Sequence, residues 1–194
     1  EAIFVELDVT ETDQMQTAVE KAIVEFGTID IMVNNAGVGS TMVPFHQESW
    51  EDWDRIISVN LRGVANGMKC ILPHMLENSY GRIINTASQL AHKPAPQAAT
   101  YCASKSAVVA LSASVAQEVA LDGITINVVC PGPTDTMMWR QSDSSWNQRK
   151  IDSLPMKRIG SIEEIAWAYV YLASDEASYV TGQSLSPNGG DVMW

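Results

Sequence analysis

Apolar residues follow two different spacings along the chain, and the alternation of these spacings predicts strands separated by helices. Short runs that are almost wholly apolar predict strands buried on both faces. Stretches with apolar residues three or four positions apart predict amphipathic helices. The predicted strands are Ile3–Leu7, Ile29–Val33, Arg82–Ala87, Ile124–Cys130 and Gln183–Pro187.

Capping signals and breakers divide the segments between these strands. A Ser or Thr followed three residues later by an acidic residue is typical of a helix start. Gly27 and Asp122-Gly123 predict helix ends, and the helix before the second of them is expected over 98–121. The predicted caps are the pairs Thr10 with Asp13, Ser49 with Asp52 and Ser161 with Glu164.

The segment Thr134–Gly160 lacks either spacing and is expected to be a long irregular loop. It carries Met137, Met138, Trp139 and Trp146 among polar residues. We interpret it as a lid over a substrate, with Met137 and Trp139 in contact with that substrate. The alternative is an interface with a neighbouring subunit.

Strands that alternate with helices predict an α/β fold with a parallel, doubly wound, Rossmann-like sheet. The length of 194 residues fits one domain. Ligands bind such sheets at the carboxyl ends of the strands. The residues expected there are Asp8-Val9, Asn34–Gly37, Ser88 and Pro131–Thr136.

Composition excludes several functions. The net charge of −11 gives no basic surface for a nucleic acid or an anionic membrane, so neither partner is expected. No apolar run is long enough to span a membrane. The three cysteines form no CxxC pair and predict reduced thiols in a cytoplasmic protein, and the three histidines lack metal-ligand spacing, so no metal is expected.

Tyr101 and Lys105 are the pair most indicative of chemistry. Four residues apart on one helix, they share a face. A nearby ammonium favours the phenolate, so we expect Lys105 to lower the pKa of Tyr101 towards neutrality. Ser88, at the end of a predicted strand, could bring a hydroxyl to the same substrate oxygen. Taken alone, the spacing recurs by chance and favours a surface helical contact, until the neighbouring motifs are considered.

Several motifs in order give the chain a resemblance to the short-chain dehydrogenase/reductase family over essentially all 194 residues. Its 3-oxoacyl-carrier-protein-reductase-like members are the most similar. The motifs are Asp8-Val9, Asn34-Asn35-Ala36-Gly37, Asn60 within Ser-Val-Asn-Leu, Ser88, Tyr101 with Lys105, Pro131-Gly132 with Thr134 and Thr136, and Tyr179–Gln183 before Gly189-Gly190.

The resemblance implies an NAD(P)-dependent enzyme that interconverts a secondary alcohol and a ketone. Tyr101 would be the general acid/base, Lys105 would lower its pKa and bind the nicotinamide ribose, and Ser88 would hold the substrate oxygen. Asn60 would maintain a helix distortion and a water in the proton path. The implied cofactor-binding residues are Asp8, Val9, Asn34, Ala36, Gly37, Tyr101, Lys105, Pro131, Gly132, Thr134 and Thr136.

Rival interpretations remain open at this point. The apolar lid favours a hydrophobic or alicyclic substrate, whereas the resemblance also permits a 3-oxoacyl-carrier-protein reductase. A protein of another class, a cofactor sensor or scaffold without turnover, is compatible with the same fold. The resemblance further implies a homotetramer or homodimer.

The family begins with a strand, a Gly-rich loop, a helix and a second strand, and none of these precedes Ile3–Leu7 here. The sequence therefore leads us to expect that 1–194 is the C-terminal three-quarters or so of one domain. Two missing strands would leave a gap between Ile3–Leu7 and Ile29–Val33 in the sheet. The second missing strand would select NAD or NADP, so the choice cannot be read here.

Overall fold

Four parallel strands form the centre of the molecule. The computed structural model describes residues 1–141 and 143–193. The sheet order is β1 (Ile31–Asn34), β2 (Gly81–Thr86), β3 (Ile124–Val129) and β4 (Ser184–Leu185). In register, Val33 lies opposite Ile84, and Ile84 lies opposite Asn127. The predicted Rossmann-like α/β sheet is confirmed.

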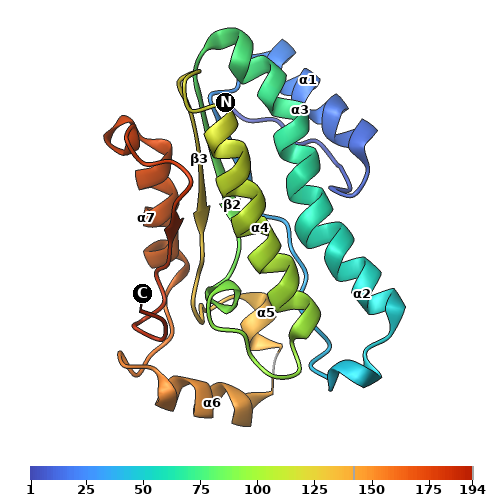
Figure 1. Ribbon diagram of the computed structural model, residues 1–194, viewed down its shortest axis with the longest axis vertical. Coiled ribbons are helices and arrows are strands. Elements are labelled where there is room, and N and C mark those ends of the chain that lie inside the picture. The colour runs from blue at the N-terminus through green and yellow to red at the C-terminus, as the bar shows by residue number, and fades with distance from the viewer. Residues whose placement is uncertain (142, 194) are drawn as a thin grey trace.

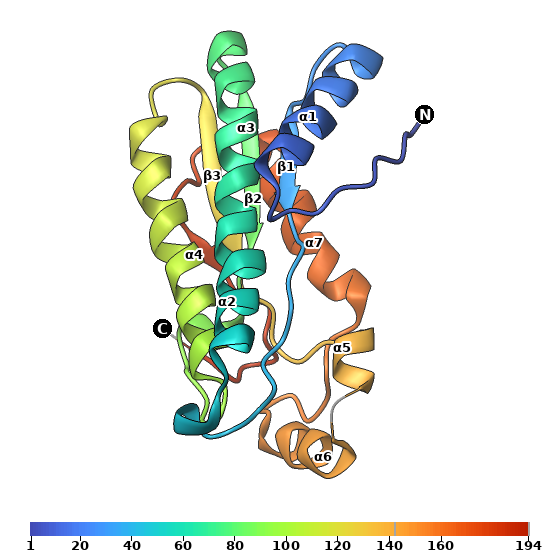
Figure 2. The ribbon, with the colours of Figure 1, turned by 90° about the vertical axis from the view of Figure 1, so that its right-hand side faces the viewer.

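Helices cover both faces of this sheet. Figures 1 and 2 show α3 (Gly63–Asn78) and α4 (Ala99–Glu118) on one face and α7 (Ile162–Ala173) on the other. Helix α1 (Thr12–Phe26) packs on α3 through Met15 and Val19. Fully buried Ile83 and Ile126 face the α3–α4 side, while Ile84 and Val129 pack against α7. Strands β2 and β3 are buried on both faces, which explains why their sequences are rich in apolar residues without strict alternation.

Two of the three predicted caps form. Ser161 and Glu164 make a reciprocal capping box at α7, and the Ser49 hydroxyl accepts a hydrogen bond from the Asp52 amide at α2 (Trp50–Ile57). The cap predicted at Thr10 is wrong. Helix α1 begins one residue after Glu11 without a side-chain cap, because the Asp8 carboxylate binds the amide and hydroxyl of Thr10 instead.

The strand predicted at Ile3–Leu7 is absent. These residues belong to no helix or strand, and the Phe4 side chain is 90% exposed. Figure 2 shows the N-terminal segment leading away from the sheet. A strand requires a hydrogen-bonded neighbour, and within residues 1–141 and 143–193 no strand pairs with this segment or with the outer edge of β1. The extent of the domain beyond this chain stays a prediction.

The irregular loop predicted over 134–160 is also wrong. It contains α5 (Met137–Arg140) and α6 (Ser144–Ser153), which are capped by the side chains of Thr136 and Asp143. Neither helix buries a residue fully, so neither shows the apolar face by which a helix is recognised in sequence. Both lie beyond the carboxyl ends of the strands (Figure 1).

Short single turns and one long helical junction complete the structure. The 3₁₀ turns are η1 (Phe45–Gln47), η3 (Gln89–Ala91) and η4 (Asp175–Ala177). Helix α2 continues into α3 through a π turn, η2 (Ser58–Arg62). None of the helices in the described part of the chain is both long and apolar enough to cross a membrane.

Candidate active site

Strands β2 and β3 end side by side, and this places Ser88. The Ala87 amide donates to the Val129 carbonyl (2.8 Å), and the Gln89 amide donates to the Pro131 carbonyl (3.0 Å). Ser88 is therefore held between two backbone bonds at the carboxyl edge of the sheet. Its side chain is buried, and its hydroxyl accepts from the Leu90 amide (3.2 Å), which begins η3.

Tyr101 approaches Ser88 from the first turn of α4. The Ser88 hydroxyl lies near enough to the Tyr101 hydroxyl to lower the pKa of that phenol. The fold thus brings Ser88 and Tyr101, which are thirteen positions apart on different elements, close together, as the sequence predicts. A carbonyl or alcohol oxygen bound at this place would be next to both hydroxyl groups.

Lys105 lies one turn further along α4 and points to the same place. Its ammonium is 5.8 Å from the centre of the Tyr101 ring and donates to the Thr86 carbonyl (2.9 Å) at the end of β2. The residue is 3% exposed. The shared helix face is confirmed, and the interpretation of the pair as a surface contact is wrong because both side chains turn inward.

The pKa values differ from the expectation. Burial raises the pKa of Tyr101, and the Ser88 hydroxyl opposes this rise only in part. Burial also lowers the pKa of Lys105 to about 8. Both shifts have one cause, since a low-dielectric site disfavours phenolate and ammonium alike. The predicted lowering of the Tyr101 pKa is therefore wrong here, and Tyr101 is a neutral phenol at neutral pH.

Asn60 ties the loop after β1 to α4. It is fully buried in the π turn, where its side-chain amide donates to the Val38 carbonyl (3.0 Å) and to the Ser104 hydroxyl (3.2 Å). Its side-chain oxygen accepts from the Val38 amide (2.8 Å). The predicted helix distortion at Asn60 is confirmed, since a π turn widens the helix at this point.

In the loop after β1, Gly37 brings backbone without a side chain next to Asn60 and Lys105. Ala36 and Gly37 are exposed, and a Cβ added at Gly37 would lie 3.3 Å from both the Lys105 Nζ and the Asn60 Oδ1. A larger residue here would require these polar atoms to shift by a few tenths of an ångström. The buried Asn34 side chain donates to the Asn85 side chain (2.8 Å) between the strands, and its predicted cofactor contact stays a prediction.

The segment after β3 closes the other side of the site. Gly132 packs so closely on the C-terminal segment that an added Cβ would lie 2.6 Å from the Asn188 Cα. The Thr134 hydroxyl donates to the Gly132 carbonyl (2.9 Å), and Thr136 caps α5. These contacts fix the path of the chain from Pro131 to Thr136.

Val9 lies near the start of the loop after β1, since Val9, Asn35 and Ala36 line the same pocket. A Cβ added at Gly63 would lie 2.7 Å from the Val9 Cγ2, so Val9 packs on the start of α3. The Asn66 side chain donates to the Val9 carbonyl (2.9 Å). The structure thus holds Asp8-Val9 beside α3, separate from Ser88 and Tyr101.

The residues of the predicted lid are Met137, Met138, Trp139 and Trp146. The two tryptophans contact each other, whereas Met137 is exposed. The Trp139 and Trp146 rings are 5.7 Å apart, which joins α5 to α6, and Met138 lies next to Gly39. The Met137 side chain is 75% exposed. The structure records no contact that brings Met137 to Ser88 or Tyr101 within the described residues.

Sequence reasoning missed a polar cluster beside Ser88, made by Gln89, Lys93, Lys150 and Asp191. No local spacing joins these residues, because Asp191 follows Lys150 by 41 positions and Lys93 by 98. Only the adjacency of Gln89 to Ser88 could have drawn attention to one member.

Comparison with known proteins shows similarity to reductases and dehydrogenases. Residues 1–191 match the family described as enoyl-(acyl carrier protein) reductase. A 3-oxoacyl-[acyl-carrier-protein] reductase of Thermotoga maritima is 37% identical over 187 residues, which cover 96% of this chain and 76% of that protein. Glucose 1-dehydrogenase 2 of Bacillus subtilis is 36% identical over 196 residues, covering all of this chain and 76% of that protein.

A solved structure is similar in fold as well. The gluconate 5-dehydrogenase of Burkholderia cenocepacia, in complex with NADP and tartrate, superposes with a TM-score of 0.91 at 33% identity. The match covers 95% of this chain and 73% of that one. The chain therefore belongs to the short-chain dehydrogenase/reductase family and is an NAD(P)-dependent oxidoreductase that acts on CH–OH and carbonyl groups.

Proposed function

We propose that this protein interconverts a small secondary alcohol and a ketone, with Tyr101 as the general acid/base. The observation that carries the proposal is the convergence of Ser88, Tyr101 and Lys105 at the carboxyl end of β2, with all three at least largely buried. A neutral, buried phenol beside a hydroxyl is suited to give a proton to a carbonyl oxygen.

Each residue then has a distinct task in ketone reduction. The Ser88 hydroxyl orients the substrate oxygen by a hydrogen bond, and Tyr101 donates its proton to that oxygen. The Lys105 ammonium stabilises the phenolate that Tyr101 becomes. Asn60 holds the loop that includes Gly37 against α4. When bound, the nicotinamide of the cofactor supplies the hydride.

The described residues fit a dinucleotide on one side of this site. Lys105 and Asn60 place polar atoms beside the bare backbone of Gly37, where a ribose could approach. We assign cofactor contacts to Asp8, Val9, Ala36, Gly37, Tyr101, Lys105 and the segment 131–136. The Asn34 side chain is already bonded to Asn85, so its contribution is to support the loop.

The relatives favour two substrate classes, which an activity panel separates. The panel contains a 3-oxoacyl thioester, a keto sugar acid and an alicyclic ketone, each assayed with NADH and with NADPH. We expect turnover of at least one carbonyl compound. A protein that binds the reduced cofactor but turns over no panel member would favour the cofactor-sensor alternative.

We further propose a cytoplasmic homo-oligomer, a tetramer or dimer. Helix α7 exposes large apolar side chains, with Trp167 at 69% and Val170 at 54% exposure. Ile162 and Tyr171 on the same helix are also exposed, and apolar side chains that gather in one patch are typical of association sites. Sedimentation of the purified protein tests the proposal, and a concentration-independent monomer would contradict it.

Cofactor affinity should depend on the charge of Lys105. Because the pKa of Lys105 is lowered to about 8, its ammonium is lost as the pH rises above that value. If the cofactor binds the ammonium form, its dissociation constant should increase by up to about tenfold per pH unit above pH 8. Fluorescence titration with NADPH between pH 7 and pH 9 measures this.

The matched variants are Lys105→Met and Lys69→Met. Lys69 is exposed on α3, so Lys69→Met should retain the wild-type pH profile. Lys105→Met should bind the cofactor more weakly and lose the inflection. If the dissociation constant of NADPH depends on pH in Lys105→Met as it does in the wild type, Lys105 does not bind the cofactor.

A further inference from the structure

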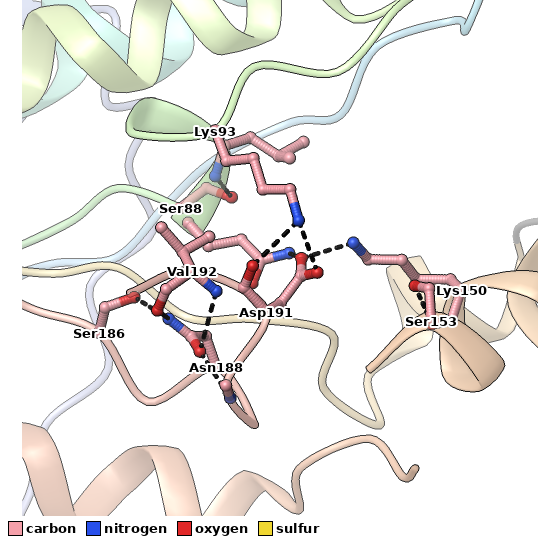
Figure 3. A network of polar contacts seen from close by, with 11 residues as sticks. Ser88, Lys93, Lys150, Ser153, Ser186, Asn188, Asp191 and Val192 are labelled. Atoms are coloured by element: carbon pink, nitrogen blue, oxygen red, sulfur yellow. Dashed lines mark hydrogen bonds and ion pairs between the residues drawn. The ribbon is translucent and has the colours of Figure 1, made fainter. Parts of the chain in front are cut away.

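A buried carboxylate, Asp191, lies where three segments meet beside the proposed site. Its side chain is only 3% exposed. One carboxylate oxygen accepts from the Gln89 side chain (2.6 Å) and from the Lys150 ammonium (2.5 Å), and the other accepts from the Lys93 ammonium (3.0 Å). Figure 3 shows both lysines directed at this carboxylate, Lys93 from above and Lys150 from the right.

The partners of Asp191 belong to the segments that enclose the substrate side. Gln89 directly follows Ser88, and Lys93 comes just after the same turn. Lys150 belongs to α6, beyond the carboxyl ends of the strands (Figure 2). Helix α6 is joined in turn to α5, since the Asn147 side chain donates to the Trp139 carbonyl (3.1 Å).

The turn that carries Asp191 is itself fixed to the sheet. The Gly132 amide donates to the Pro187 carbonyl (3.0 Å). The Asn188 side chain donates to the Ser186 hydroxyl (3.0 Å) and to the Val192 carbonyl (3.0 Å), and it accepts from the Gly190 amide (2.9 Å). Asp191 therefore lies on a hydrogen-bonded turn after β4 that is tied to the segment after β3, whereas Lys150 lies on α6, which has no buried residue.

We propose that Asp191 is a positioning residue. It holds α6 against the turn that begins at Ser88 and includes η3 (the Ser88 turn), and so keeps the site closed where the substrate would bind. The role rests on the proposed function. Without the carboxylate, two ammonium groups would face each other without an anion between them, and repulsion would drive α6 outward. The Ser88 turn would lose its side-chain tie through Gln89 at the same time.

The electrostatics agree with this geometry. Burial raises the pKa of Asp191, but hydrogen bonds and charge from Lys150 and Lys93 outweigh it and leave the pKa below its ordinary value. The carboxylate is thus charged throughout the neutral range, and the contact persists there. Charge-assisted hydrogen bonds of this kind are stronger than hydrogen bonds between neutral groups.

The test compares Asp191→Asn with Asp152→Asn, a matched change at an exposed acid on the same helix α6. Trypsin cleavage after Arg149 or Lys150 reports on α6 without requiring turnover. We expect Asp191→Asn to be cleaved about fivefold faster or more, since local opening governs proteolysis, and Asp152→Asn to match the wild type. Equal cleavage in all three proteins would overturn the proposal.

Kinetics provide the readout that a purely structural role would not move. With the carbonyl substrate found in the panel, Asp191→Asn should raise KM about tenfold and leave the dissociation constant of NADPH unchanged. Asp191→Glu should recover part of the loss. A change in cofactor affinity with no change in KM would contradict the assignment to the substrate side.

Lys150→Met keeps the test decisive if Asp191→Asn fails to fold. It removes only the contact from α6, and Arg149 remains as a trypsin site. Faster cleavage at Arg149 in Lys150→Met supports the proposal, and wild-type cleavage overturns it. Trypsin cleavage does not depend on catalytic turnover. A negative cleavage result is therefore distinguishable from failure of the proposed reaction, which the Tyr101→Phe variant tests.

Discussion

Replacement of Tyr101 by phenylalanine is expected to lower kcat for ketone reduction by about 10²- to 10⁴-fold, the range over which general acid–base catalysis contributes. The change removes the Tyr101 hydroxyl, which is the proposed proton donor beside Ser88. The aromatic ring remains, so its contact with the Lys105 ammonium is kept. Steady-state oxidation of NADPH with saturating ketone measures the effect.

The control for this variant is Tyr179→Phe, because Tyr179 is fully exposed and remote in sequence from Tyr101. It should retain wild-type kcat. The dissociation constant of NADPH should be similar in all three proteins, since neither change removes a charge. A Tyr101→Phe enzyme with wild-type kcat would exclude Tyr101 as the proton donor.

The second large effect is expected for Asn60→Ala, which should lower the free energy of unfolding by about 3 kcal/mol. Alanine leaves the amide and carbonyl of Val38 without the partner that Asn60 supplies, and it also removes a bond to Ser104. The corresponding fall in Tm is roughly 9 °C for a chain of this size. Thermal unfolding followed by circular dichroism measures it.

Activity should fall with stability in this variant, because the loop released by Asn60→Ala includes Gly37, which lies beside Lys105. The matched control is Asn78→Ala at the exposed end of α3, where the asparagine, among the residues that the structure describes, bonds to His74 of its own helix. We expect a change in Tm of at most a few degrees there. Similar losses in both variants would show that Asn60 has no special structural role.

Local signals in the sequence predicted the elements whose formation is decided locally. The capping box of Ser161 and Glu164 forms as predicted, because its two hydrogen bonds involve neighbouring residues. The buried strands were recognisable because both of their faces are covered. Ser88, Tyr101 and Lys105 were found because the fold places strand ends together, and helix spacing sets the last two on one face.

Features that depend on distant partners could not be predicted in this way. Ile3–Leu7 has the composition of a strand, but pairing with another strand decides whether one forms. The pKa of Tyr101 depends on its burial, which the spacing of Lys105 does not reveal. The Asp191 cluster joins three segments whose closeness is a property of the folded chain alone.

The outer edge of β1 has a practical consequence for work with this protein. Within the described residues, no strand occupies that edge, and the Ile31 and Val33 side chains along it are 46% and 45% exposed. Unpaired backbone with branched apolar side chains is a template for intermolecular strand addition. Concentrated samples should therefore form β-rich aggregates unless another polypeptide segment covers this edge.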